Sequence, residues 1–587
     1  MRLLGLLLKG SALVLAGVLG LIAVQPAAAW LNVRLTQSFF DSLGNRPAWD
    51  SMAVILIGIA LVNAVGLLVR HGQDYLNDLL SIRAVRQLES YLFSILNPVT
   101  ITRIETPDYN HDLHLLRNSL SRLQHTVISL AGVCNQAVLA GIYGYIILLQ
   151  AWPLLLIVLL YQTPSLIYEI RHAARLEKQF ASVSQQELEM HHLSELMTKP
   201  YGLKELLLFG LKPFLLRKWQ TAATGKARRD SQYKRQEAAQ RSWISLLSPA
   251  GLLGTQLYLL TQIIDGSLTI GGYMAMMLAI GNLEQALPAI GVQGRVFKQI
   301  RLFSHQYAAF AAKYGKEAGS AGADLVEPIV SLEAENIHYS YPGSDSVAVT
   351  GVSLHLHKGD FIAIVGENGS GKSTLGKILL GLHDLNGGEL YVNGTPLRGL
   401  RRESVYARAA VVHQDYLRYP MTIAENIAFD SGGNARESLR RLSIRHPWLI
   451  TEQIARQLDS LAGMELLHSK PLSGGQWQRI AIARALHKPH DVLLLDEATS
   501  ELDPEAEVDF LTDLLRDKDR RITILITHNL KLAALADRIF VMRNGEVAEE
   551  GPHRELMNRE QRYAAMYRKQ NERIGGDRLA DQLLGTV

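Results

Sequence analysis

The sequence predicts a multidomain protein in which an α-helical membrane domain with six spans is followed by an α/β domain. Long apolar stretches are confined to the first half of the 587 residues, and from about Glu327 onward the pattern is that of a charged, water-soluble protein. In that second half an apolar, strand-like run leads through a glycine-rich loop into a helix. We therefore expect a membrane domain at 1–312, a linker at 313–328, an α/β domain at 329–572 and a C-terminal tail at 573–587.

Six stretches of the first half are long and apolar enough, or nearly so, to span a bilayer. A helix needs about 20 such residues to cross the hydrocarbon core, because its backbone polar groups must be satisfied within the segment. The stretches lie at about 3–25, 52–70, 124–149, 152–170, 243–264 and 269–292. Very short connections at Gln150–Pro153 and Asp265–Ser267 predict that the third and fourth spans, and the fifth and sixth, form helical hairpins.

The distribution of basic residues predicts the orientation of these spans. The loops after the second and fourth stretches are rich in arginine and lysine, whereas the other loops have almost none, so the rich loops belong in the cytoplasm. The α/β domain is then cytoplasmic as well. A net charge of +4 in a chain of this length gives no argument for a nucleic-acid partner.

The first apolar stretch has two interpretations. Met1, Arg2, an apolar core and then Pro26–Ala29 resemble a secretory signal peptide with its cleavage site. Against cleavage, Lys9 interrupts the apolar run and Leu31–Leu43 continues a helical pattern, as in an extended first span.

Glu284 is an ionisable residue inside the sixth stretch. A carboxylate is costly in lipid, so it is expected to face the bundle interior or a cavity, and it is a candidate functional residue by default. A partner such as Arg295 would make it purely structural.

The glycine-rich loop has the composition and context of a phosphate-binding loop. The strand-like run Phe361–Val365 leads into GENGSGKST, and the apolar helical stretch Leu375–Leu382 follows. Glycines let backbone N–H groups surround phosphates, the lysine reaches the β- and γ-phosphates, and the serine hydroxyl takes a Mg²⁺ position. The candidate residues are Gly366, Glu367, Asn368, Gly369, Ser370, Gly371, Lys372, Ser373 and Thr374.

Two acids follow a second buried strand. The run Asp491–Leu495 is nearly all apolar, as in a buried parallel strand, and it ends at Asp496 and Glu497. Asp496 is expected to hold Mg²⁺ directly or through water, and Glu497 to polarise an attacking water. The alternative for such a pair is a helix cap.

Ser473, Gly474, Gly475 and Gln476 come directly before the predicted helix Trp477–Leu486. Exposed N–H groups and the helix dipole make such a position an anion site. An ordinary N-cap followed by a tight turn explains the same residues. The spacing does not choose between the two.

The ordered set GENGSGKST, LSGGQ, LLLDEATS and the later Ile526-Thr527-His528 resembles the ATP-binding cassette (ABC) family. The resemblance implies that two cassettes hold two ATP molecules between them, with the phosphate loop of one facing LSGGQ of the other. A chain with one cassette is therefore expected to work as a homodimer, with ATP and Mg²⁺ as its cofactors.

The resemblance also implies roles for individual residues. Tyr341 corresponds to the aromatic residue that stacks on adenine, and Gln414 to the glutamine that contacts Mg²⁺ and water. Glu497 corresponds to the catalytic base, His528 to the histidine near the γ-phosphate, and Asp503 to the loop that reaches the partner cassette.

Six spans before a cassette resemble the exporter fold of multidrug, lipid and peptide transporters. In that fold short transverse helices dock on the cassettes, and the candidates here are Pro107–Leu113 and Leu211–Trp219. Lys204–Gly210 and the LSGGQ segment look most like bacterial peptide exporters of the lantibiotic and lasso-peptide kind. The residues before LSGGQ, Leu467–Pro471, lack the Glu-Gly pair that is usual in this fold, so coupling between cassette and membrane domain is expected to differ.

We therefore expect an ATPase that exports a peptide from the bacterial cytoplasm across the inner membrane by alternating access. Export or flipping of a lipid or an amphipathic drug is the alternative substrate hypothesis. A nucleotide-gated channel or sensor is an alternative of another class, but it would tolerate a degraded catalytic site, whereas Glu497 and His528 are both present.

Overall fold

The structure is a computed structural model that describes residues 12–43, 49–96, 104–314, 322–344, 346–429, 435–463 and 467–574. The chain divides into two compact units. A helical unit comprises residues 1–97 and 111–315, and an α/β unit comprises residues 98–110 and 316–587.

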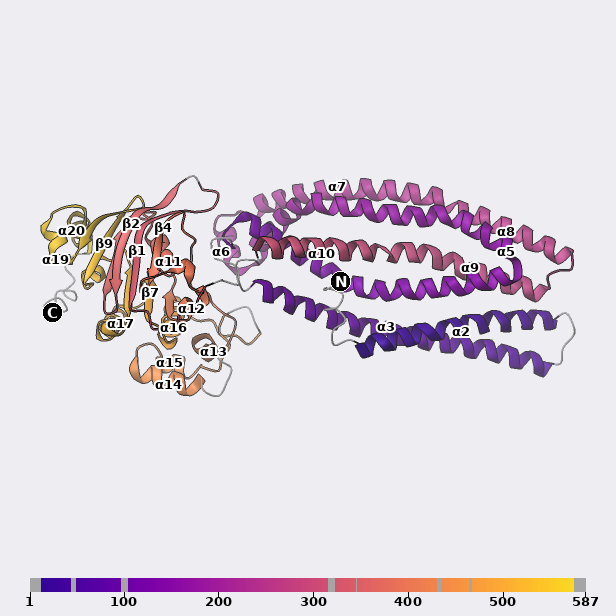
Figure 1. Ribbon diagram of the computed structural model, residues 1–587, viewed down its shortest axis with the longest axis horizontal. Helices are drawn as coiled ribbons and strands as arrows, with labels where there is room; N and C mark the ends of the chain where they lie inside the picture. Colours follow the sequence, from indigo (N-terminus) through magenta and orange to yellow (C-terminus); the bar gives the residue numbers. More distant parts are fainter. Residues whose placement is uncertain are drawn as a thin grey trace. The chain divides into compact units, whose positions relative to one another are not determined.

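Long helices make up the helical unit, and they run alongside one another in Figure 1. They are α2 (Ala12–Leu43), α3 (Trp49–Leu96), α5 (Pro107–Thr198), α6 (Pro200–Leu208), α7 (Lys212–Ser245), α8 (Leu247–Ile264), α9 (Ile270–Gln293) and α10 (Arg295–Tyr314). α2 is continuous through Pro26–Ala29, and the start of the predicted first span lies outside the described residues.

Among the described residues, five helical segments are long and apolar enough to cross a membrane. They are Ala12–Leu43, Trp49–Tyr91, Leu130–Glu169, Lys212–Ile264 and Ile270–Gln293. The predicted count of six is thus not confirmed. The predicted third and fourth spans largely overlap the single segment Leu130–Glu169, which is interrupted at Ala151, where φ is −156° and ψ is 78°.

The prediction of two separate transverse helices was wrong in its boundaries. Pro107–Leu113 is the beginning of the long helix α5, and Leu211–Trp219 contains the beginning of α7. The short separate helix is α6, which ends before Gly210, a residue with a φ of 62°. A proline in the first turn of a helix marks where the helix begins and not where it ends. The left-handed glycine Gly210 separates α6 from α7, so the short helix lies before the range that the sequence predicted.

The start of α9 is fixed by polar contacts to its neighbours. The Thr269 side chain accepts a hydrogen bond from the Gly272 N–H (3.0 Å), and Asp41 of α2 accepts one from the Gly271 N–H (2.9 Å). A Cβ at Gly271 would lie 2.2 Å from the Gln37 carbonyl oxygen, so only glycine lets α2 and α9 approach this closely. The apolar core of the unit is built mainly from α5, α8 and α9.

Two sheets form the frame of the α/β unit. The antiparallel sheet has the order β2 (Val347–His357), β1 (Ser331–Ser340), β4 (Gly387–Val392) and β5 (Thr395–Pro396). The six-stranded sheet has the order β10 (Glu546–Gly551), β9 (Arg538–Arg543), β3 (Phe361–Gly366), β8 (Ile522–Ile526), β7 (Val492–Asp496) and β6 (Ala409–Val412). All its neighbours are parallel except β10, which pairs antiparallel with β9.

The central strands are buried on both faces because their alternate side chains enter two different cores. Leu493 and Leu495 of β7 pack into one core, and Leu494 packs into the other. The second core lies against α11 (Lys372–Leu379) and the antiparallel sheet, whereas the first is covered by helices. This double burial explains the uninterrupted apolar runs of β3, β7 and β8.

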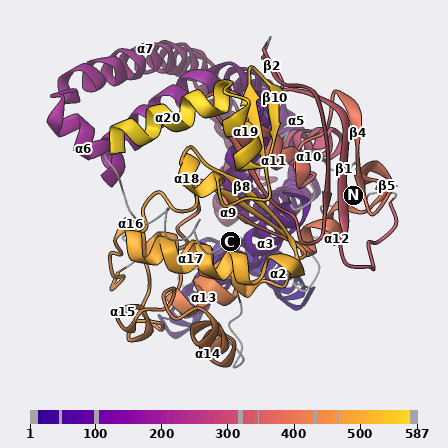
Figure 2. The same cartoon turned by 90° about the vertical axis from the view of Figure 1, so that its left-hand side faces the viewer.

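Several of the helices that cover the first core lie together in one group. α13 (Ile423–Ala428), α14 (Ala435–Arg445) and α15 (Glu452–Ala455) gather near α16 (Gly474–His487) and α17 (Pro504–Arg516), as Figure 2 shows. The remaining helices are α12 (Arg402–Ala407), α18 (Leu530–Ala533), α19 (His553–Asn558) and α20 (Arg562–Ile574), with short 3₁₀ turns η1 (Leu397–Gly399) and η2 (Lys518–Arg520).

Candidate nucleotide-binding site

The loop between β3 and α11 is shaped to surround an anion. Gly366, Gly369 and Gly371 have φ values of 151°, 78° and 99°, in the region that favours glycine. A Cβ at Gly366 would lie 2.4 Å from the Met542 carbonyl oxygen, and one at Gly371 equally close to that of Ala348. The loop is thus held tightly against neighbouring backbone while its own N–H groups stay available at the start of α11.

Lys372 lies folded onto this loop. Its Nζ donates to the carbonyl oxygens of Gly366 (3.0 Å) and Glu367 (2.9 Å). Burial lowers the pKa of Lys372, and the negative charges of Glu497 and Asp496 oppose that shift. The hydroxyl of Ser370 is buried and has no partner among the described residues. A buried cation and an orphaned hydroxyl in one glycine loop fit a phosphate ligand, which would satisfy both.

Ser373 and Asp496 bring a hydroxyl and a carboxylate together from two elements. Ser373 Oγ donates to Asp496 Oδ1 at 3.1 Å, which links the first turn of α11 to the end of β7. Burial raises the pKa of Asp496, while the hydrogen bond from Ser373 and the lysine charges work in the opposite direction. Hydroxyl and carboxylate oxygens are ligands that suit Mg²⁺, so this pair fits the ion. Among the described residues, no group of three or more His, Cys, Asp or Glu side chains is placed to hold a metal ion.

Glu497 follows Asp496 and is held from two sides. Gln414 Nε2 donates to Glu497 Oε2 at 2.8 Å, and His528 Nδ1 lies 3.3 Å from Glu497 Oε1. The Glu497 side chain is 16 % exposed, whereas His528 is 62 % exposed. Glu497 has a φ of 52°, which is uncommon for a residue with a side chain and breaks the extended backbone directly after β7. The structure thus brings together the three residues that the resemblance marked as catalytic.

Tyr341 belongs to a group of aromatic side chains. Its ring meets those of Tyr339 and His383 edge to face, at centroid distances of 5.2 and 5.6 Å, and Tyr339 stacks on His383 at 4.7 Å. The Tyr341 hydroxyl is 3.0 Å from Thr374 Oγ1, which ties the ring to the helix that begins at the phosphate loop. Tyr341 is half-buried and so keeps part of its ring accessible.

Ser473 caps α16 in the structure. Its side chain accepts from the Gln476 N–H (3.3 Å), and the Gln476 side chain accepts from the Ser473 N–H (2.9 Å), which makes a capping box. A Cβ at Gly474 would lie 2.3 Å from Glu501 Oε2, so glycine lets Glu501 approach. The N-cap interpretation is therefore right as local structure, and the exposed start of α16 keeps the features of an anion site.

Asp503 is an N-cap as well. It accepts from the Ala506 N–H (2.9 Å) at the start of α17, and its other oxygen is 2.5 Å from Arg479 Nη2. The backbone hydrogen bond from Ala506 lowers the pKa of Asp503, burial opposes this shift, and the hydrogen bond and charge of Arg479 lower the pKa further. Arg479 lies on α16, so this pair joins the segment after Glu497 to the LSGGQ helix.

Sequence reasoning missed two residues of α20 that reach the site. Arg562 Nη2 donates to Glu367 Oε1 in the phosphate loop at 2.7 Å. The Gln570 side chain accepts from the Leu530 N–H (2.8 Å) and donates to the His528 carbonyl oxygen (3.0 Å). α20 is amphipathic in sequence, but nothing in its pattern names these partners.

Comparison with known proteins identifies the family of this site. Residues 349–500 match the family model described as ABC transporter. This chain belongs to the ABC transporter family. It is an exporter of that family with a fused membrane domain, and hence an ATPase coupled to transport.

Relatives within the family differ in what their names say they transport. The chain is 28 % identical over 411 residues to the subtilin transport ATP-binding protein SpaT of Bacillus subtilis, an alignment that covers 67 % of this chain and 66 % of SpaT. It is 27 % identical over 547 residues to an ATP-dependent lipid A-core flippase of Dechloromonas aromatica, covering 90 % of each protein.

A solved structure shares the fold along nearly the whole chain. A bacterial Atm1-family ABC exporter with ATP bound matches with a TM-score of 0.76 and 22 % sequence identity, covering 96 % of this chain and 98 % of that one. The helical domain followed by a cassette is therefore the ABC exporter fold.

Proposed function

We propose that two copies of this chain form an ATP-driven exporter of an amphipathic peptide in the bacterial cytoplasmic membrane. The observation that carries the proposal is the position of Glu497, held by Gln414 and His528 next to a phosphate loop on the same chain as the membrane helices. A sensor or gated channel has no need for a carboxylate positioned in this way.

Each candidate site residue of the cassette then has a role in ATP binding or hydrolysis. The loop 366–374 and Lys372 bind the phosphates, and Tyr341 packs against the adenine. Ser373, Gln414 and Asp496 would hold Mg²⁺, which would neutralise charge at the phosphates. Glu497 accepts a proton from the attacking water, and His528 keeps the carboxylate in place.

The signature segment Ser473–Gln476 is proposed to act on the nucleotide of the partner chain. Its hydrogen bonds are made within the capping box and to Tyr416, whose hydroxyl donates to the Gly474 carbonyl oxygen (3.2 Å). Among the described residues, no hydrogen bond joins the segment to the loop 366–374. A second copy would supply the facing loop, and Asp503 would lie in the adjoining interface. ATP then favours the closed dimer, and hydrolysis resets it.

A polar contact within the membrane domain supports an amphipathic substrate with a positive charge. The Tyr161 hydroxyl of α5 donates to Glu284 of α9, and the Tyr161 ring packs on Gly251 of α8. A carboxylate inside a span is costly and thus a candidate for recognising a cation. The Arg295 side chain, the alternative partner from sequence, lies outside the described part of the chain.

Lipid flipping is the second candidate, because the flippase relative aligns along 90 % of this chain. Purified protein in nanodiscs distinguishes the candidates by substrate-stimulated ATP hydrolysis. We expect cationic amphipathic peptides to raise the wild-type rate at least two-fold, and Glu284→Gln to abolish that stimulation while basal hydrolysis remains. Stimulation by lipid A analogues and not by peptides would contradict the peptide proposal.

A further inference from the structure

A second cavity of the cassette lies at the opposite end of the strands from the nucleotide site. It has a volume of about 380 Å³ and is lined by α14, the end of α16 with the segment after it, and η2 with the residue before β8. The nucleotide site gathers at Asp496, the end of β7, whereas His490 and Arg521 of the cavity precede β7 and β8. Five residues of strand separate the two sites by roughly 16 Å. The volume lies within the range of small-molecule sites.

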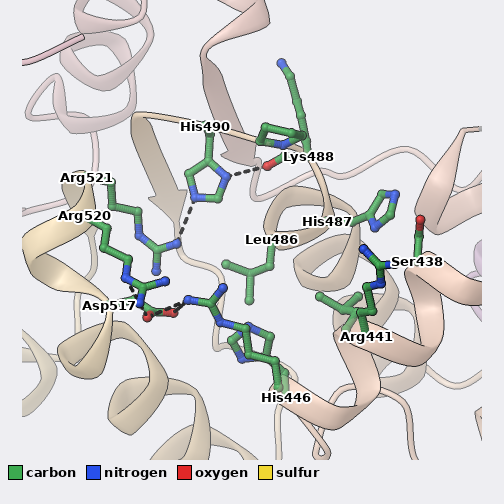
Figure 3. Close-up of a pocket in the computed structure, with 13 residues that line it drawn as sticks. Ser438, Arg441, His446, Leu486, His487, Lys488, His490, Asp517, Arg520 and Arg521 are labelled. Atoms are coloured by element: carbon green, nitrogen blue, oxygen red, sulfur yellow. Dashed lines mark hydrogen bonds and ion pairs between the residues drawn. The ribbon is translucent and has the colours of Figure 1, made fainter. Parts of the chain in front are cut away.

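The lining of this cavity is strongly basic. Four arginines line it, Arg441, Arg445, Arg520 and Arg521, and its lining holds a single carboxylate, that of Asp517. The Lys488 side chain is directed elsewhere, because its Nζ donates to the carbonyl oxygens of Tyr406 and Ala409. Figure 3 shows Arg520, Arg521 and Asp517 on one side of the cavity and Arg441, His487 and Ser438 across it.

Asp517 is already neutralised by one of these arginines. Arg445 Nη2 lies 2.7 and 2.8 Å from its two oxygens. Burial by itself would raise the pKa of Asp517, but Arg445 and the charges of Arg521 and Arg520 outweigh burial and lower it. The carboxylate therefore stays ionised and balances one cation. Arg441 Nε lies 3.3 Å from Glu437 Oε1 on α14, so the excess positive charge of the lining comes from Arg520 and Arg521.

Arg521 is a buried cation without an acidic partner in hydrogen-bond contact. It is 7 % exposed, and its Nε is buried with no hydrogen-bond partner among the described residues. Its Nη1 donates to His490 Nε2 at 2.9 Å, while His490 Nδ1 donates to the Lys488 carbonyl oxygen at 2.6 Å. Burial lowers the pKa of His490 to about 4, so at neutral pH the imidazole is an uncharged acceptor. A buried guanidinium whose contacts leave a donor unused is costly unless an anion completes its shell.

We propose that this cavity binds a small anion that carries phosphate groups. Guanidinium groups match phosphate oxygens with paired donors, and here they approach from α14 and from η2 with the residue that follows it. The hydroxyl of Ser438 adds a donor from α14. A bound anion would bridge α14 to the segments that lead into β7 and β8 of the six-stranded sheet.

Direct binding of inorganic pyrophosphate to the full chain tests the proposal. The Lys372→Ala substitution weakens the phosphate loop as a competing site, so calorimetric titration is done in that background, in nanodiscs of phosphatidylcholine. We expect saturable binding that Arg441→Gln combined with Arg520→Gln weakens at least ten-fold. Both side chains are mostly exposed, at 79 % and 71 %, so the variant is expected to fold and, with Lys372 intact, to keep its basal ATPase activity.

Arg440→Gln is the matched control, because Arg440 lies on α14 and does not line the cavity. It is expected to bind pyrophosphate like the parent. Absence of saturable binding in the parent, or equal affinity in the control and the double variant, would overturn the proposal. The single variant Arg520→Gln is expected to lose an intermediate part of the pyrophosphate affinity. If the double variant misfolds, full affinity in this single variant would overturn the proposal.

The same titration in nanodiscs that contain phosphatidic acid identifies the source of the anion. Unchanged affinity for pyrophosphate supports a soluble phosphate compound as the ligand. If acidic lipid displaces pyrophosphate, the phosphate of a lipid headgroup occupies the site.

Discussion

Glu497 is the residue on which the proposed ATPase chemistry depends. Gln414 and His528 hold its carboxylate, and its backbone has a left-handed conformation directly after β7. In Glu497→Gln the amide keeps the shape but cannot accept a proton, so ATP turnover should fall about 100-fold or more. ATP affinity should stay near that of the parent. Filter-binding of labelled ATP beside a phosphate-release assay measures both, and normal turnover would remove Glu497 from its assigned role.

Lys372 should behave differently, because it acts in binding. Its Nζ bonds to loop carbonyls at 3.0 and 2.9 Å and is the buried cation of the phosphate loop. Lys372→Ala should therefore lower ATP affinity at least ten-fold, as measured by equilibrium binding of a fluorescent ATP analogue. Glu497→Gln in the same assay is the control that retains affinity, and equal affinity in the two variants would contradict the division of roles.

His490 makes the cassette sensitive to acid. Its pKa is about 4 in the folded protein against 6.5 ordinarily, so the unfolded chain binds the proton first as the pH falls. The stability that the neutral imidazole contributes is complete above pH 6.5 and is lost between pH 6.5 and 4, at most about 3 kcal/mol. In His490→Gln the melting temperature of the cassette should change less with pH over that range. His355→Gln, at an exposed histidine, is the control, and an unchanged pH profile in His490→Gln would contradict this account.

At the scale of elements, α20 contacts two parts of the nucleotide site and is expected to hold them in position. Gln570 bonds to both Leu530 and His528, and Arg562 bonds to Glu367 of the phosphate loop. Gln570→Ala frees the backbone that carries His528, so we expect kcat to fall several-fold with little change in ATP affinity. The loss of two hydrogen bonds should cost about 1–3 kcal/mol. Lys569→Ala, on the same helix and exposed, is the control, and equal kcat in both variants would contradict a positioning role.

The sequence could predict elements whose boundaries rest on local chemistry. The strand before the phosphate loop, the helix after it and the strand before Asp496 were all predicted within a few residues, because both cores bury these strands and the loop needs its glycines. The helices near Pro107 and Leu211 were misplaced, since long helices continue wherever no residue interrupts them. Contacts of α20 were not predictable, because residues about 40 and 195 positions apart meet only in the folded chain.

The residues of the candidate site likewise divide into those that the sequence could predict and those that it could not. The spacing of Lys372, Ser373, Asp496 and Glu497 within motifs identified them, and the structure brings Ser373 to Asp496. Ser473 was ambiguous from sequence because a helix cap and an anion site use the same atoms, and the structure shows the cap. The basic cavity next to α14 gave no sequence signal, because its arginines come from segments far apart in the chain.

On the scale of the whole molecule, the account requires two copies of the chain to share each ATP. Lys372 and Ser473 belong to different anion sites of one cassette, with no hydrogen bond between their segments among the described residues. If each ATP lies between the Lys372 loop of one copy and the Ser473 segment of the other, a defect in each can be separated onto two chains.

The most direct test is the ATPase activity of isolated heterodimers carrying two different affinity tags. In the first heterodimer one chain has Lys372→Ala and the other has Ser473→Arg, which leaves one intact shared site. In the second, both substitutions are on one chain and the other chain is wild type, which leaves none. We predict clear ATP hydrolysis by the first heterodimer, up to about half the wild-type rate, and almost none by the second. Activity in the second and none in the first would show that each chain completes its own site, and would contradict the account.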